Sequence, residues 1–217
     1  ITPGSADGQG PAAAFNNPRG MAIDSSNNIY VADMSNHRIR KITSSGAVTT
    51  IAGSSVGYLD ASSSLSAQFN SPTGIAFNNS SGVIYVADTS NNRIRQISNT
   101  GVVTTLAGTA VSGFVDGQGS AAKFSYPTSL ALDSSGNLFV SDYTNFSIRR
   151  VTPSGAVITF AGNGASSFIN ATGTAASFKR VEGLVVDVAG NVYVADSGGN
   201  TIRKITSSAV VSTFSGL

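Results

Sequence analysis

Short apolar runs separated by polar turns extend along the whole chain. In the first quarter the runs cover residues 20–24, 29–33, 38–43 and 48–52, and Ser, Asn and Gly fill much of the sequence between them. Short runs rich in β-branched and aromatic residues, joined by such turns, are typical of consecutive antiparallel hairpins. Because no window keeps the period of about 3.6 residues that marks an amphipathic helix, the pattern predicts an all-β protein.

The same arrangement of runs recurs four times. The aromatic residue of the second run in each unit lies 55, 54 and 54 residues after its counterpart in the preceding unit. A fixed period in this range indicates a repeat architecture. We therefore expect a single domain over residues 1–217 that is built from four units. Their approximate bounds are 1–53, 54–108, 109–162 and 163–217.

Each unit carries apolar side chains on both faces of its predicted sheet. In the first unit Tyr30 and Ala32 point to one face, and Ile29 and Val31 point to the other. A sheet that is apolar on both sides must lie between two further layers, and sheets stacked radially around an axis meet this need. The sequence thus predicts a β-propeller of four four-stranded antiparallel blades. A closed ring, an open arc that pairs with another copy, and a segment of a longer protein remain alternatives.

The first unit contains the segments 18–24, 28–33 and 36–42, which read PRGMAID, NIYVAD and NHRIRKI. This pattern resembles an NHL repeat. The second unit matches it nearly as well, whereas Ser129 replaces the Gly in the third unit and Val181 replaces the Pro in the fourth. The resemblance covers essentially the whole chain and implies an NHL-type β-propeller. It leaves the function open, because NHL propellers include lyases, RNA binders and scaffolds.

Two charged residues recur in every unit, and we interpret both as structural. The carboxylate can accept hydrogen bonds from loop N–H groups and face the arginine of the next strand, whose planar fork reaches a carboxylate or a carbonyl oxygen. A ring of arginines for phosphates or RNA is the less favoured alternative. The aspartates are Asp33, Asp88, Asp142 and Asp196, and the arginines are Arg40, Arg95, Arg149 and Arg203.

The remaining aspartates lie mostly in turns and loops, where a calcium site is one possible interpretation. Asp7, Asp60 and Asp116 lie in the segments that join the units. No such loop supplies three closely spaced carboxylates, so we assign these residues a role in stabilising turns. We expect no metal site and no cofactor.

The amino-acid composition excludes several other kinds of site. The chain has no cysteine, one histidine and one glutamate, which excludes disulfides, thiolate zinc sites, His-rich metal sites and a pair of catalytic glutamates. A net charge of +2 is too small to argue for nucleic acid, which we do not expect as a partner. No apolar run approaches the roughly 18 residues of a membrane helix, so we expect no membrane span.

The predicted channel lining argues against catalysis. By the NHL resemblance, the first strand of each unit is innermost, and an enzyme needs a nucleophile, a base or a metal set held near its substrate. We therefore expect a protein that is not an enzyme. A lyase or lactonase-like propeller and an RNA-binding NHL domain are the alternatives. The innermost segments 21–23, 75–77, 130–132 and 184–186 contain only apolar side chains.

Residues that depart from the repeat are the candidates for binding. The residues before the innermost strands should ring one mouth of the channel, and Glu182 would pair with Arg19 if four units close a ring. In the loops, Tyr143 and Phe146 replace small polar residues, and exposed aromatics often anchor interfaces. We expect His37 to be an exposed loop residue. The candidate rim consists of Arg19, Lys179, Arg180 and Glu182, and the candidate loop residues are His37, Tyr143 and Phe146.

Composition also favours a location outside the cell. Only 11% of the residues are charged, and segment 7–10, which recurs at 116–119, resembles a long inter-blade loop of extracellular NHL proteins. The expected function is a scaffold or interaction module, with a protein or glycan partner or self-association into an assembly or filament. Acceptor motifs for N-glycosylation occur at Asn78, Asn79, Asn145 and Asn170.

Overall fold

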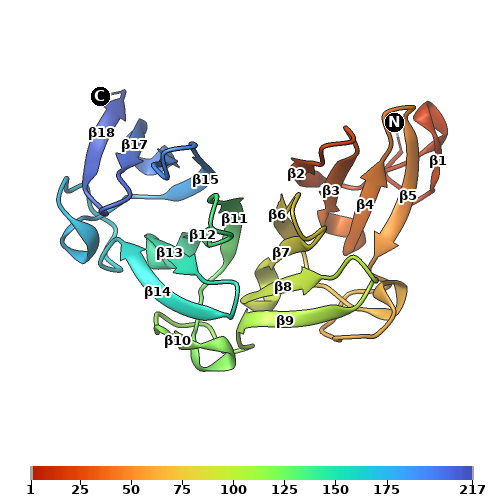
Figure 1. The fold of residues 1–217 in the computed structure, drawn as a ribbon, viewed down its shortest axis with the longest axis horizontal. Helices are drawn as coiled ribbons and strands as arrows, with labels where there is room; N and C mark the ends of the chain where they lie inside the picture. The colour runs from red at the N-terminus through yellow and green to blue at the C-terminus, as the bar shows by residue number, and fades with distance from the viewer. Residues whose placement is uncertain (1, 217) are drawn as a thin grey trace. The chain divides into compact units, whose positions relative to one another are not determined.

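A computed structural model describes residues 2–216 of the chain, which form four antiparallel sheets of consecutive strands (Figure 1). The chain divides into two compact units, Ile1–Thr105 and Leu106–Leu217, and each is described by itself. Short one-turn 3-10 helices connect the strands. The prediction of an all-β protein with four-stranded antiparallel blades is confirmed. The prediction of one domain with the stated blade bounds stays a prediction.

The first unit contains two sheets. In both, strands follow one another in chain order, and hairpin turns such as the one that Asp24 closes join them. The first sheet comprises β2 (Pro18–Ile23), β3 (Ile29–Asp33), β4 (Arg38–Ile42) and β5 (Ala47–Ala52), with η2 (Met34–Asn36) between β3 and β4. The second comprises β6 (Pro72–Phe77), β7 (Ile84–Asp88), β8 (Arg93–Ile97) and β9 (Val103–Gly108), whose last strand runs past the unit boundary, with η3 (Ser64–Ser66) and η4 (Thr89–Asn91).

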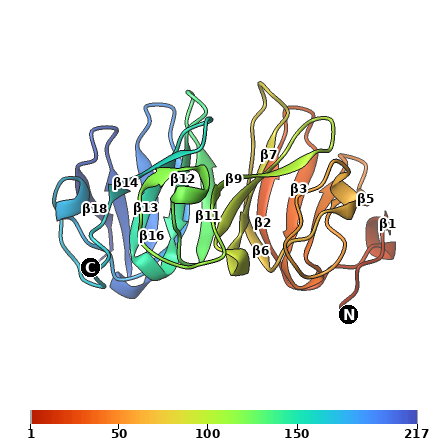
Figure 2. The ribbon, with the colours of Figure 1, turned by 90° about the horizontal axis from the view of Figure 1, so that it is seen from below.

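The second unit repeats this organisation, and Figure 2 shows its strands running side by side. The third sheet comprises β11 (Pro127–Leu132), β12 (Leu138–Asp142), β13 (Ser147–Val151) and β14 (Ala156–Ala161), with η5 (Gly119–Ala121) and η6 (Tyr143–Asn145). The fourth comprises β15 (Val181–Val186), β16 (Val192–Asp196), β17 (Thr201–Ile205) and β18 (Val211–Ser215), with η7 (Gly173–Ala175) and η8 (Ser197–Gly199).

The segments predicted as inter-blade loops also pair with the sheets. β1 (Gly8–Gln9), followed by η1 (Gly10–Ala12), pairs antiparallel with β5, and β10 (Gly117–Gln118) pairs with β14. In the second and fourth sheets single bridges join Ala61 to Val103 and Thr172 to Val210. The pattern of apolar runs does not predict these strands. Their pairing covers the last strand of each sheet, which would otherwise expose unpaired N–H and C=O groups.

The hydrophobic core of each unit lies between its two sheets. In the first unit Tyr30, Ala32 and Ile39 of the first sheet pack with Ile75 and Val86 of the second. The alternation of the strands sends these side chains to one face, as the sequence pattern predicts. In the second unit an equivalent cluster joins the third and fourth sheets. Among residues 2–216, no helix has the length and hydropathy required to cross a membrane.

Candidate functional site: buried arginines and the outer loops

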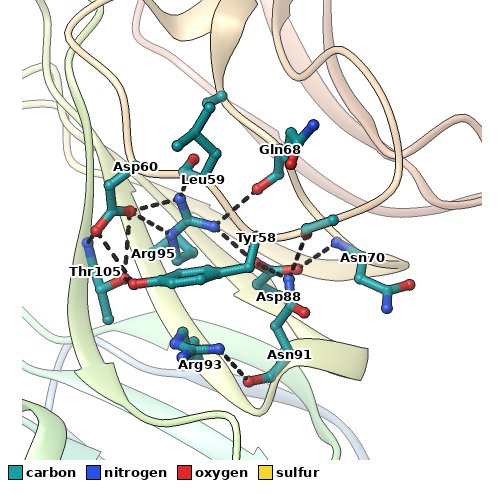
Figure 3. Close-up of polar contacts among 12 residues, drawn as sticks. Tyr58, Leu59, Asp60, Gln68, Asn70, Asp88, Asn91, Arg93, Arg95 and Thr105 are labelled. Carbon is teal, nitrogen blue, oxygen red and sulfur yellow. Dashed lines mark hydrogen bonds and ion pairs between the residues drawn. The ribbon is translucent and has the colours of Figure 1, made fainter.

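A buried arginine in the third strand of each sheet organises the polar interior, and Arg95 on β8 shows the full pattern (Figure 3). Its Nε donates to Asp60 Oδ1 at 3.0 Å, and its Nη1 donates to Asp88 Oδ2 at 2.8 Å and to the carbonyl oxygen of Gln68 at 3.0 Å. Its Nη2 donates to the carbonyl oxygen of Leu59 at 2.9 Å and also to Asp60. All five N–H groups of the guanidinium are therefore used.

Asp88 connects this arginine to the next loop. Its Oδ1 accepts the backbone N–H of Asn70 at 2.7 Å, and its Oδ2 accepts Asn91 Nδ2 at 2.9 Å as well as Arg95. Burial raises the pKa of Asp88, and the hydrogen bonds and the charge of Arg95 oppose that effect. In the third sheet burial raises the pKa of the equivalent Asp142 to about 6, against the opposing charge of Arg149 and the hydrogen bonds from Asn145, Ser125 and Arg149.

The other three sheets repeat the network except at the arginine Nε, which binds Asp60 in Arg95 but has no hydrogen-bond partner among the described residues in Arg40, Arg149 and Arg203. Each arginine is fully buried, contacts the strand-end aspartate at 2.7–3.1 Å, and bonds two loop carbonyl oxygens. The loop partner is Asp7 for Arg40 at 2.8 Å and Asp116 for Arg149 at 2.7 Å. In the fourth sheet it is the neutral Asn170, whose Oδ1 accepts Arg203 Nη2 at 2.7 Å.

The loop aspartates thus differ from their predicted role. Asp7, Asp60 and Asp116 do not simply close local turns, because each reaches across about 33–35 residues of sequence to a buried guanidinium. Each also binds a threonine of the last strand; Asp7, for example, accepts the N–H of Thr50 at 3.0 Å. These bonds fasten the loop to the edge of its own sheet.

Aromatic rings cover the guanidinium of Arg95 on both sides. The ring centroids of Phe69 and Tyr58 lie 5.0 and 4.9 Å from its central carbon, within the range of cation–π contact. Phe124 and Phe114 enclose Arg149 in the same way, and Phe178 and Phe168 enclose Arg203. The first sheet has only the inner ring, Phe15, at 5.0 Å, because Ser5 stands two residues before Asp7.

Tyr58 binds a second arginine. The guanidinium of Arg93 lies 3.6 Å from its ring centroid, and its hydroxyl lies 3.0 Å from Thr105 Oγ1 and donates to Asp60 at 3.4 Å. Two cations and two hydrogen bonds thus hold the Tyr58 ring in place, while 43% of the residue stays exposed to solvent.

In each of three loops, the aromatic residue that contacts the arginine and the aliphatic residue after it keep part of their side chains exposed. We call Tyr58–Leu59, Phe114–Val115 and Phe168–Ile169 the outer-loop pairs. All six side chains are between 39% and 47% exposed. The carbonyl oxygen of each aliphatic member accepts from the buried arginine, so the backbone is fixed although the side chain faces solvent. The sequence analysis missed these pairs, although an aromatic residue two positions before each loop acceptor marks them.

The predicted rim residues lie at the starts of the first strands. Arg19, Lys179 and Arg180 are exposed, and Glu182 is half-buried, with its Oε1 accepting from Ser197 Oγ at 3.4 Å. Arg180 also lies over the ring of the predicted loop residue Tyr143, at 5.7 Å. Arg19 and Glu182 belong to different units, so their pairing stays a prediction.

The three predicted loop residues are not the exposed side chains that we expected. His37 is half-buried, and its Nδ1 accepts the backbone N–H of Ser71 at 3.0 Å. Burial lowers the pKa of His37, which favours the neutral ring that this bond requires. Tyr143 and Phe146 are also half-buried. His37 and Phe146 share a left-handed backbone that ends the preceding 3-10 turn.

The predicted glycosylation motifs differ in how far their amide groups are engaged. Both N–H groups of Asn145 donate, to the carbonyl oxygen of Gly113 and to Asp142, each at 2.8 Å. Asn78 Oδ1 closes its hairpin turn, and Asn170 binds Arg203 and Thr213. Asn79 is exposed and accepts the N–H of Ser25 through its Oδ1, which leaves its amide nitrogen outside that bond.

Within residues 2–216, no three His, Asp or Glu side chains gather closely enough to hold a metal ion.

Comparison with known proteins identifies the repeat. The profile described as NHL repeat matches residues 15–42, 69–97 and 124–151. NHL repeat-containing protein 2 of Gallus gallus is 40% identical over 119 residues, which are 54% of this chain and 16% of that protein. SUPPRESSOR OF QUENCHING 1, a chloroplastic protein of Arabidopsis thaliana, is 24% identical over an alignment of 274 residues, covering 93% of this chain and 26% of the relative. The chain thus spans about a quarter or less of these relatives.

Solved structures share the fold. A protein of unknown function from Bacteroides thetaiotaomicron has a TM-score of 0.71 at 22% identity, over 91% of this chain and 48% of that one. An auxiliary nutrient binding protein from Bacteroides ovatus has a TM-score of 0.68 at 17% identity, over 94% and 50%. Virginiamycin B lyase from Staphylococcus aureus has a TM-score of 0.64 at 20% identity, over 91% and 55%. Identities at this level show a common fold and nothing about activity.

Proposed function

The chain belongs to the NHL-repeat β-propellers, and from this premise we propose that it is a non-catalytic interaction module that binds a partner protein through its outer-loop pairs. The observation that carries the proposal is the contrast within each loop. Its backbone is fastened to a buried guanidinium, whereas its aromatic and aliphatic side chains stay exposed.

A fixed loop with exposed apolar side chains favours binding for two physical reasons. Burying an exposed aromatic or aliphatic side chain releases about 25 cal/mol per Å² of apolar surface. A loop that is already ordered loses little conformational freedom when a partner binds, so less of that gain is cancelled. Aromatic residues are also enriched among the residues that dominate interface energy.

The use of the repeated charges supports a non-catalytic role. A general acid or base must reach a substrate, but Asp33, Asp88, Asp142 and Asp196 are fully buried and bonded to arginine and loop donors. A lyase is the alternative that the fold raises. The test is to incubate the chain with a streptogramin B antibiotic and to analyse the mixture by chromatography. We expect the antibiotic to stay unchanged. Turnover of the antibiotic that a channel-lining substitution abolishes would overturn this part of the proposal.

Site-specific photo-crosslinking tests the binding surface. A photo-reactive residue is placed at Leu59, at Val115 or at Ile169 of the full chain, and at exposed Ser62 of the same loop as Leu59 as the matched control. After exposure to the medium and extract of the source cells, the three loop positions should give the same protein adduct and Ser62 should not. Excess unmodified chain should compete for the adduct, and a chain with aspartate at all three loop positions should not.

Two outcomes would refute the binding surface. One is an adduct at Ser62 as strong as at Leu59, and the other is competition by the aspartate-substituted chain. The proposal also includes a location outside the cell, which rests on the low content of charged residues, 11%. Finding the protein in the cell interior by fractionation would remove that part without touching the loop surface.

A further inference from the structure

One face of the first sheet is not covered by the other sheet of its unit, and part of this face is exposed. In the first unit the corresponding face of the second sheet packs on the first sheet, and there Ile75 is only 5% exposed. Strand register makes Met21 of β2 the equivalent of Ile75, since Met21 pairs with Val31 as Ile75 pairs with Val86. Yet Met21 is 68% exposed, and Ile23 on the same face is 56% exposed.

The fourth sheet has the opposite face uncovered. In the second unit this face of the third sheet packs on the fourth, where Ile148 is fully buried and Phe160 is 7% exposed. The equivalent residues of the fourth sheet are Ile202 and Phe214, which are 39% and 61% exposed. Val185 of β15 lies on the same face and is 62% exposed. The first and fourth sheets thus carry the two halves of one type of interface, and neither half has its counterpart within its own unit.

A glycine on the fourth sheet has the same incomplete environment. A side chain at Gly20 of β2 would collide with the carbonyl oxygen of Thr73 on β6, so glycine is needed for the two first strands to approach. Gly183 of β15 occupies the equivalent position, but a Cβ there would meet no atom within 4 Å. Gly183 also lies at the register shift between Val181 and Leu184, as Gly20 lies at the shift between Pro18 and Met21, and a glycine suits such an irregular pairing at both positions.

The charges next to these faces are complementary. Arg19 of β2 and Glu182 of β15 occupy the same position in the repeat, immediately before Gly20 and Gly183. In the first unit Gly20, which follows Arg19, lies against Thr73 and Gly74 at the start of β6. A neighbour packed on the fourth sheet in that geometry would place its own β2, with Arg19, beside Glu182. Opposite charges at an interface favour this register over others.

We propose that a second copy of this chain packs head to tail on the first, with the fourth sheet of one copy against the first sheet of the other. The contact repeats the sheet-on-sheet interface that each unit already contains. Two copies supply eight sheets, within the roughly four to eight blades of known propellers. The inference is independent of the outer-loop proposal, because those pairs lie on neither face.

Sedimentation velocity of the 217-residue chain tests the pairing. The unmodified chain should show a mass above one copy that grows with concentration. Met21→Asp and Val185→Asp each place a charge on one face and should each reduce the mass to one copy. Val111→Asp is the matched control, because Val111 is 60% exposed but lies on neither face, and it should behave as the unmodified chain. All three side chains are exposed, and circular dichroism checks that the variants stay folded.

Mixing the two variants separates head-to-tail pairing from other contacts. Each variant retains one intact face, so an equimolar mixture of Met21→Asp and Val185→Asp should recover a two-copy species that neither forms alone. Arg19→Glu should weaken the self-association, and Glu182→Arg added in the same chain should restore it. A one-copy mass for the unmodified chain at every concentration would overturn the proposal. So would a two-copy mass for either single variant alone, or a mixture that stays at one copy.

Discussion

Changing Asn170 to aspartate should stabilise the second unit, because it completes an ion pair that the other three sheets already have. In those sheets a loop aspartate binds the buried arginine: Asp7, Asp60 and Asp116. In the fourth sheet Asn170 Oδ1 accepts Arg203 Nη2 at 2.7 Å, so the acceptor is in place and only the charge is missing. The substitution keeps the shape of the side chain and adds one carboxylate oxygen.

Two opposing contributions determine how much the Asn170→Asp change stabilises the folded protein. A hydrogen bond to an ionised acceptor is roughly twice as strong as a neutral one, which favours the carboxylate. Solvent reduces the gain, because Asn170 is exposed and the side chains of its aspartate counterparts are 37–49% exposed; half-exposed pairs contribute about 0.2–1 kcal/mol. Thr213 can in addition donate to the new oxygen, as Thr159 does to Asp116 at 2.9 Å. We expect a stabilisation of about 1 kcal/mol in total.

Thermal unfolding at neutral pH measures this change. For a chain of this size about 1 kcal/mol corresponds to a rise in Tm of roughly 2–4 °C. Asn163→Asp is the matched control, because Asn163 lies in the same loop and its Oδ1 accepts only the N–H of Ala165 among the bonds of the described residues. It adds the same charge without an arginine, so its Tm should stay within about 1 °C of the original. An Asn170→Asp protein no more stable than the Asn163→Asp protein would refute the reasoning.

The pH dependence of the gain in Tm provides a second test of the ion pair. Burial raises the pKa of Asp116, but hydrogen bonds from Thr159 and Arg149 and the charge of Arg149 outweigh it and hold the pKa below its ordinary value. The new carboxylate at position 170 should behave alike. A lowered pKa in the folded state gives stability that is present above the unfolded value of about 3.9 and is lost as the pH falls through the folded pKa. The Tm advantage should therefore vanish in strongly acidic buffer, and an advantage that persists there would contradict the ion-pair explanation.

Three further predictions follow from the same contacts. Arg95→Lys keeps the charge, but lysine cannot make five directed hydrogen bonds. Urea unfolding should therefore show that the free energy of unfolding falls by about 3 kcal/mol. The control Arg19→Lys, at an exposed position, should lower it by less than about 0.5 kcal/mol. Gly53→Ala should destabilise by more than about 1 kcal/mol in the same assay, because its φ is +94° and a Cβ would lie 2.5 Å from the carbonyl oxygen of His37. In a glycosylating host, peptide mass spectrometry should find glycan on Asn79 and none on Asn145, whose N–H groups are both engaged.

The repeated features could be predicted from the sequence because each of them occurs in all four units. The runs at 29–33 and their counterparts fix the strands, and an aspartate and an arginine seven residues apart predict a contact across adjacent strands. The structure contains that contact, from Asp33 to Arg40 at 2.8 Å. Only residues within one hairpin are involved, so the spacing alone places them together.

The long-range partners could not be predicted in the same way. Asp7 meets Arg40 across 33 residues because β1 folds back on β5, and two residues such as Gly8–Gln9 carry no strand signal of their own. The exposure of His37 was predicted wrongly for a related reason. Its neighbour Ser71 lies immediately before β6 of the next sheet, and contacts between one sheet and the next are not visible in the pattern of a single strand.

The fourth repeat shows how far structure tolerates change in sequence. The family profile matches three repeats and not the fourth, where Val181 replaces proline and Thr201 replaces an arginine. The four strands nevertheless form with the same register. Val181 and Thr201 are both buried, so they fill space within the sheet rather than direct its pairing. The strands form because the alternation of apolar side chains and the Asp196–Arg203 contact are retained.

The exposed apolar side chains of the first and fourth sheets and Gly183 support the same proposal. On a strand that faced only water, polar side chains would serve better, yet Met21 and Val185 keep the apolar character of their buried equivalents. Glycine inside a strand costs roughly 0.5–1 kcal/mol relative to alanine, and a Cβ at Gly183 would meet no atom of the described residues within 4 Å. Each feature is unfavourable for a chain whose end faces stay bare and becomes favourable once another sheet packs against it. Because packing of another sheet would make these features favourable, we base the proposal of a second copy on the first and fourth sheets and not on a polar cluster.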